Sequence, residues 1–226
     1  MIATANNLSI CINYHLFQIN VISLLILVIV CACCYFISAK EKYFIWCAIA
    51  AIAWLTFIYS LLTPDLSLFY NGIPPSKLSL TFLISFTFVF NLFLRDFTLQ
   101  RFTPLERYSF YFIAIFLLLL YLVPYVIISS VLSITIYLGF ILFVRSIINT
   151  LFTKAKYVAL LNIVLSISLL LGSIEFLKYL GFIDYEPSLI LLISLFLTIS
   201  LTAIVLLRML SDRRYAGRLP FSSSRH

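Results

Sequence analysis

YSFYFIAIFLLLLYLVPYVIISSVLSITIYLGFILFV, residues 108–144, is a run of 37 residues without a charged side chain, bounded by Arg107 and Arg145. As one helix rising 1.5 Å per residue it would measure about 55 Å. The hydrocarbon core of a bilayer is only about 30 Å thick. Two shorter helices that turn at Val123-Pro124-Tyr125 fit that thickness. We therefore predict two membrane spans here, and this choice decides whether the chain has seven spans or six.

The composition of the whole chain requires an apolar solvent. Hydrophobic residues make up 64% of the 226 residues and charged residues only 10%, whereas a water-soluble domain carries about a quarter charged residues. A bilayer must therefore surround most of the chain. Helices are the expected form, because open strand edges leave backbone groups without hydrogen bonds in lipid.

The apolar segments predict an all-α integral membrane protein built as a seven-transmembrane helix bundle. Residues 1–15 form a short extracytoplasmic segment, residues 16–210 the membrane domain, and residues 211–226 a cytoplasmic basic tail or linker. The predicted spans are Leu16–Ser38, Tyr43–Leu62, Leu78–Leu94, Tyr108–Leu122, Val126–Ile148, Tyr157–Ile174 and Pro187–Leu210.

The basic residues predict the orientation. If seven spans alternate across the membrane, all of the 15 Lys and Arg residues except Lys77 and Lys178 fall on one side. Cytoplasmic loops carry the excess of Lys and Arg, so the N-terminus is predicted outside and the C-terminus inside. A single span over residues 108–144 would move Arg145 and the basic residues after it to the other side. The charge bias thus favours seven spans, and it explains the net charge of +7 without a nucleic-acid partner.

The sequence carries no recognisable catalytic or metal-binding motif. It lacks HExxH, a nucleophile elbow, a Walker loop and GxGxxG, and its only histidines are His15 and His226. The five cysteines give neither a disulfide framework nor the ligand pairs of a zinc site. We therefore expect no enzyme activity, no cofactor and no metal.

Polar side chains near the outer ends of spans are the candidate ligand-binding residues. Glu175 and Lys178 are three residues apart and share a helical face, which suits either a charged pocket floor or a solvated interfacial pair with an extended Lys. Tyr59 lies near the outer end of the second span, and Asn20 lies in the first. An interfacial anchor for Tyr59 and an interhelical hydrogen bond for Asn20 are the alternative roles.

The end of the last span is the candidate output segment. Arg208, Arg213 and Arg214 follow its apolar run. They are typical of a stop-transfer cluster facing anionic lipid. They equally suit a helix that leaves the membrane and transmits motion to a cytoplasmic partner, and the two interpretations are compatible.

The stretch LFLRDFTLQRFTPLERYSFYF, residues 92–112, resembles the membrane domain of bacterial seven-transmembrane receptors with diverse intracellular signalling modules. Those domains end their third helix with Leu-Arg-x-Phe, followed by a basic loop with a Pro and a charged pair. Weaker similarities occur at residues 179–183 and 206–210, and the seven-helix region ahead of some histidine kinases is similar too. The matching residues are Arg95, Phe97, Arg101, Pro104, Glu106 and Arg107.

The resemblance implies a multi-pass sensory domain of the bacterial inner membrane. It would bind an unknown ligand and control a cytoplasmic cyclase, kinase or phosphatase, fused or separate, and it would act as a homodimer. Two departures from the family are that only about 15 residues precede the first span, and that a short basic tail follows the last. The alternative functions are a transporter or channel component, or an accessory scaffold subunit of the membrane.

Overall fold

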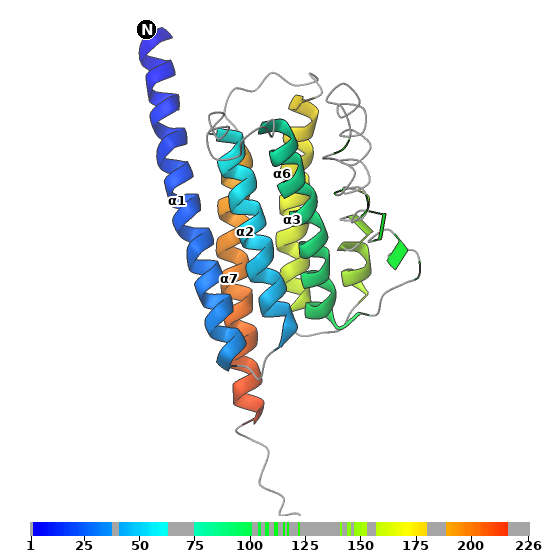
Figure 1. Cartoon of the computed structure of the whole chain (residues 1–226). Helices are drawn as coiled ribbons and strands as arrows, with labels where there is room; N and C mark the ends of the chain where they lie inside the picture. Colours follow the sequence, from blue (N-terminus) through cyan, green and yellow to red (C-terminus); the bar gives the residue numbers. More distant parts are fainter. Residues whose placement is uncertain are drawn as a thin grey trace, which may run out of the picture. The chain divides into compact units, whose positions relative to one another are not determined.

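The computed structural model describes residues 2–37, 41–62, 75–100, 157–179 and 189–216, with scattered residues between 104 and 152. In this part of the chain all regular secondary structure is helical (Figure 1). The predicted spans Tyr108–Leu122 and Val126–Ile148 lie almost entirely outside the described residues. The helices are α1 (Ile2–Ile37), α2 (Lys42–Leu62), α3 (Pro75–Thr98), α6 (Val158–Tyr179) and α7 (Leu189–Ala216).

Within the described residues, four helices are long and apolar enough to cross a bilayer. The spanning stretches are Tyr14–Ile37, Lys42–Ser60, Thr81–Thr98 and Leu189–Ser211. The apolar stretch of α6, Val158–Ile174, is shorter. These helices make the chain a multi-pass membrane protein, as the composition predicts.

Two helices extend well past their predicted ends. α1 begins at Ile2 rather than at Leu16, because no Gly or Pro interrupts residues 2–37. Its 36 residues give a length of about 54 Å at 1.5 Å per residue. α7 continues past Leu210 to Ala216 and ends directly before Gly217, a residue type that commonly follows the last helical position.

The chain forms two compact units. The first contains residues 1–44 and 156–226, and the second contains residues 45–155. The first unit thus holds α1, α6 and α7 together with the first turn of α2. The second holds the rest of α2 and α3.

In the first unit, α7 packs against both α1 and α6. The buried face of α1 repeats every three or four residues, the spacing of a coiled-coil seam. A similar spacing occurs along α7. The buried positions are Asn20, Leu24, Leu27, Cys31 and Cys34 on α1, and Leu191, Ser194, Thr198, Leu201 and Val205 on α7.

The opposite face of α1 is formed by large exposed aliphatic side chains, including Ile22, Ile26 and Ile29. On a helix of spanning length such a face suits contact with lipid tails. α1 therefore has one face packed against protein and one face open to the bilayer.

In the second unit, α2 and α3 are joined at both ends and in the middle. Trp46 Nε1 donates a hydrogen bond of 2.9 Å to Asp96 Oδ2, and the hydroxyls of Ser60 and Ser79 are 2.8 Å apart. Between these contacts the rings of Trp54 and Phe86 lie 4.6 Å apart. Because positions advance along α2 while they recede along α3, the two helices are antiparallel.

A continuous row of aromatic rings follows one side of α3. The centroid distances from Phe86 to Phe90, from Phe90 to Phe93 and from Phe93 to Phe97 are 5.3, 5.6 and 5.5 Å. These separations are within the favourable range for aromatic pairs. Phe90, Phe93 and Phe97 are almost fully buried, so this row forms much of the unit's interior.

α3 ends in a Schellman motif with an unusual residue. The Gln100 amide donates to the Arg95 carbonyl at 3.1 Å, and the Leu99 amide approaches the Asp96 carbonyl at 3.4 Å. Leu99 has a φ of 57°, the left-handed conformation that glycine normally supplies at this position. A leucine there keeps the turn but adds steric strain.

Candidate functional site: the α1–α7 seam

The first end of the α1–α7 seam, at Asn20, is closed by an amide that reaches across the two helices. Asn20 Nδ2 donates to the Leu191 carbonyl of α7 at 2.7 Å and to the Leu16 carbonyl of its own helix at 3.1 Å. Asn20 is 0% exposed. Its Oδ1 atom is buried without a hydrogen-bond partner among the described residues. The amide therefore joins α1 to the first turn of α7, while its Oδ1 atom remains a buried hydrogen-bond acceptor.

The other end of the seam, at Cys34, is held by a sulfur–sulfur contact and by a cation–π contact. Cys34 Sγ of α1 donates to Met209 Sδ of α7 at 3.2 Å. One residue earlier on α7, the Arg208 guanidinium lies 4.6 Å from the ring centroid of Tyr43, in the first turn of α2. A guanidinium at this distance from a ring face makes a favourable cation–π contact. Both contacts fall where the apolar run of α7 gives way to its basic end.

The two ends together establish the direction of the helices. Asn20 pairs with Leu191 and Cys34 with Met209, so residue numbers rise together along both helices. α1 and α7 are therefore parallel. Two well-separated contacts thus join α7 to α1.

α7 is continuous through the seam and beyond it. Its 28 residues give a length of about 42 Å, longer than the roughly 30 Å hydrocarbon core. Arg213 and Arg214 belong to the continuous helix, while their side chains lie outside the described residues. The predicted output residues thus belong to the same continuous helix as Leu191, which contacts Asn20.

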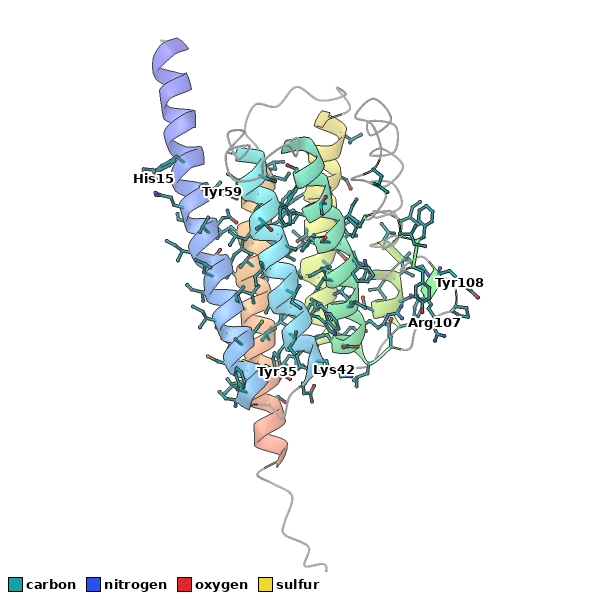
Figure 2. All side chains as sticks on the ribbon, viewed as in Figure 1. His15, Tyr35, Lys42, Tyr59, Arg107 and Tyr108 are labelled. Atoms are coloured by element: carbon teal, nitrogen blue, oxygen red, sulfur yellow. The ribbon has the colours of Figure 1, made fainter. Side chains whose placement is uncertain are left out.

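The predicted ligand-binding residues do not all fall in one place. Asn20 lies in the seam. Glu175 and Lys178 lie in the last turns of α6, where the side chains of both are outside the described residues. Tyr59 belongs to the second unit, is partly exposed, and lies at the end of α2 opposite Lys42 (Figure 2).

The Leu-Arg-x-Phe sequence lies at the C-terminal end of α3, in the second unit. Arg95 and Phe97 are buried, and Asp96 between them accepts the hydrogen bond from Trp46. Pro104 and Arg107 are exposed, and Arg101 and Glu106 lie outside the described residues. This sequence therefore joins α3 to α2 and forms the end of the helix.

Sequence reasoning did not identify Tyr43, Met209 or the Leu191 carbonyl as seam residues. The carbonyl has no side-chain signature. The spacing from Asn20 to Cys34 does carry the heptad pattern, but nearly every neighbouring residue is also apolar. A lipid-facing helix therefore lacks the polar contrast that makes such a stripe visible.

The class of protein defined by these features is an α-helical, multi-pass membrane protein whose first and last described helices form a parallel pair. The chain matches no family model, no curated protein and no solved structure.

Proposed function

We propose that the chain is a seven-span sensory domain that passes a signal through α7 to a cytoplasmic output module. Its N-terminus is outside, its C-terminus is inside, and the membrane is the bacterial inner membrane. It works without catalytic chemistry of its own. The observation that carries the proposal is the continuity of α7, from its contact with Asn20 at one end to the basic segment at the other.

The direction of α7 supports an odd number of spans. Helices that cross a membrane in alternation are parallel to the first only at odd positions. α7 is parallel to α1, as the paired contacts of Asn20 and Cys34 require. With α1, α2, α3, α6 and α7 each crossing once, one helix in residues 108–144 would give six spans and an antiparallel last helix. Two helices there give seven spans.

The exit of α7 supports a cytoplasmic output. Arg208 lies at the inner end of the apolar stretch, over the Tyr43 ring. A small rotation or shift of α7 would break this contact and reorient Arg213 and Arg214. Receptor families that control dimeric enzymes use such helices, so the chain is proposed to act as a homodimer.

The test is to lock the inner end of the seam. Met209→Cys places a thiol opposite the native Cys34, and oxidation then joins α1 to α7. The locked chain, fused after His226 to a histidine-kinase output domain, is expected to hold one activity as bilayer thickness is varied. Reduction restores the response. A disulfide that forms fully and leaves the response unchanged would show that this seam does not carry the signal.

Transport is the second candidate, favoured by one observation. α6 and α7 bury several polar side chains within their apolar stretches: Asn162, Ser168, Ser194 and Thr198. The Thr198 hydroxyl donates to the Ser194 carbonyl of its own helix at 2.7 Å, so this group is used internally. Ion or solute flux through liposomes containing the purified chain would favour transport over signalling.

A further inference from the structure

Two buried thiols lie one turn apart on α1, and the second of them contacts a thioether of α7. Cys31 and Cys34 are 0% and 2% exposed, and neither is part of a disulfide. Being three residues apart, they share one face of α1, with β-carbons about 5–6 Å from each other. The Cys34 thiol already contacts the Met209 thioether of α7 at 3.2 Å.

The donor set is all sulfur, and this selects the ion. Among the described residues, no group of three or more His, Cys, Asp and Glu side chains is placed to hold a metal. The described residues thus offer no site for an ion that prefers oxygen or nitrogen ligands. Thiolate and thioether sulfur are soft donors that suit copper(I), zinc and iron–sulfur clusters, and of these only monovalent copper(I) is neutralised by a single thiolate. The Met209 thioether supplies the third sulfur donor.

We propose that Cys31, Cys34 and Met209 form a copper(I) site that joins α1 to α7. Binding replaces the proton of one thiol by Cu⁺, and the proton passes to water. One thiolate and one monovalent ion make a neutral centre, with the second thiol and the thioether as uncharged donors. Neutrality matters because an unpaired charge buried in an apolar medium is very costly.

The geometry requires only a small opening of the seam. Two sulfur atoms bound to one ion at about 2.3 Å each lie roughly 4 Å apart, slightly more than the 3.2 Å between Cys34 Sγ and Met209 Sδ. Methionine has three rotatable bonds and adapts readily to irregular spaces, so a rotation of Met209 provides the extra distance. The bound ion would then hold α1 to α7 at the point where α7 leaves the apolar stretch.

The test is a copper(I) titration of the full-length chain, kept reduced under anaerobic conditions in lipid nanodiscs, against a chromogenic copper(I) chelator. The expected stoichiometry is one ion per chain. Cys34→Ser and Cys31→Ser should each weaken binding by more than about 100-fold, and Met209→Leu by about 10- to 100-fold. Cys33→Ser is the matched control, because Cys33 lies between the two ligands on α1 and is exposed. It should bind copper(I) like the unchanged chain.

Two further measurements separate ligation from folding. Thermal unfolding without metal should leave Met209→Leu near the unchanged chain, since leucine and methionine fill similar volumes. X-ray absorption of the copper-loaded chain should show sulfur neighbours alone. Copper(I) binding that survives Cys34→Ser, that disappears in Cys33→Ser, or that shows nitrogen or oxygen neighbours would overturn the proposal.

Discussion

The α1–α7 pair and the α2–α3 pair are each held together by contacts between two helices, but the side chains that make these contacts differ. Both pairs are joined at their two ends, but α1 and α7 are parallel and meet through small or aliphatic residues. α2 and α3 are antiparallel and meet through the Trp54–Phe86 ring pair and two hydrogen bonds. Inside a bilayer, lipid tails are as apolar as the helices, so packing and hydrogen bonds must hold helices together. The α2–α3 pair is joined by one large ring pair and two hydrogen bonds, whereas α1 and α7 pack closely through smaller side chains.

This difference indicates which pair is fixed and which can move. Sliding of α2 along α3 would separate the rings of Trp54 and Phe86 and break the hydrogen bonds at both ends of the pair. A seam held by one amide, one sulfur contact and aliphatic packing has a smaller barrier to rotation or shift. We therefore expect the pair that includes the proposed output helix to shift more readily than the α2–α3 pair.

The largest effect is expected from the aromatic row. Phe93→Ala removes a ring that is fully buried between Phe90 and Phe97. The loss of packing and the cavity left behind should lower the free energy of unfolding by about 3–5 kcal/mol. SDS titration in mixed micelles measures this change. Phe36→Ala is the control, since Phe36 is 80% exposed on α1, and a comparable loss there would contradict the contrast between the pairs.

The next largest effect is expected at the inner end of α2 and α3. Trp46→Phe keeps a ring but removes the donor to Asp96. A hydrogen bond to a charged group contributes about 1.5–3 kcal/mol, and the same titration should show a loss in this range. Combined with Asp96→Leu, the effects should be less than additive. Full additivity would mean that the bond contributes nothing to stability.

A smaller effect is expected at the outer end of the seam. Asn20→Leu removes the bond to the Leu191 carbonyl. Interhelical hydrogen bonds in membranes average about 0.6 kcal/mol, with a maximum of about 1.7 kcal/mol. Gln18→Leu is the matched control, because Gln18 is an exposed polar residue two positions earlier on α1. If both substitutions change stability equally, the Asn20 contact does not join the helices.

The smallest effect is a stabilisation in the second unit. Leu99 holds a left-handed conformation at the end of α3 and is 76% exposed. Leu99→Gly relieves strain of about 1–2 kcal/mol and adds an entropic cost of about 0.5–1 kcal/mol. The net expectation is a gain of about 0.5 kcal/mol. Leu99→Ala keeps the β-carbon and should give no gain, so equal results from the two variants would exclude strain as the cause.

The sequence was sufficient for the helical class and for most helix positions, because the length and apolarity of a span are local properties. It was less reliable at helix ends. Residues 2–15 contain polar side chains, so the prediction began the first helix at Leu16, yet nothing in them breaks a helix and α1 starts at Ile2. The αL turn at Leu99 was also invisible, since leucine does not signal it.

The candidate site was harder to predict than the fold. Asn20 and Arg208 were found because polar residues are conspicuous in apolar segments. Their partners are a backbone carbonyl and a ring on another helix. Which helix faces which is a property of packing, and no single span contains that information.

The most direct test of the account is the location of the two chain ends across the membrane. In a background without native cysteines, Ala3→Cys and Ser222→Cys are each exposed to a membrane-impermeant thiol reagent in intact spheroplasts. The parallel α1–α7 pair and the inward basic residues predict labelling at position 3, and labelling at position 222 only after lysis. Labelling of both positions, or of neither, in intact spheroplasts would place the two ends on one side and contradict seven spans.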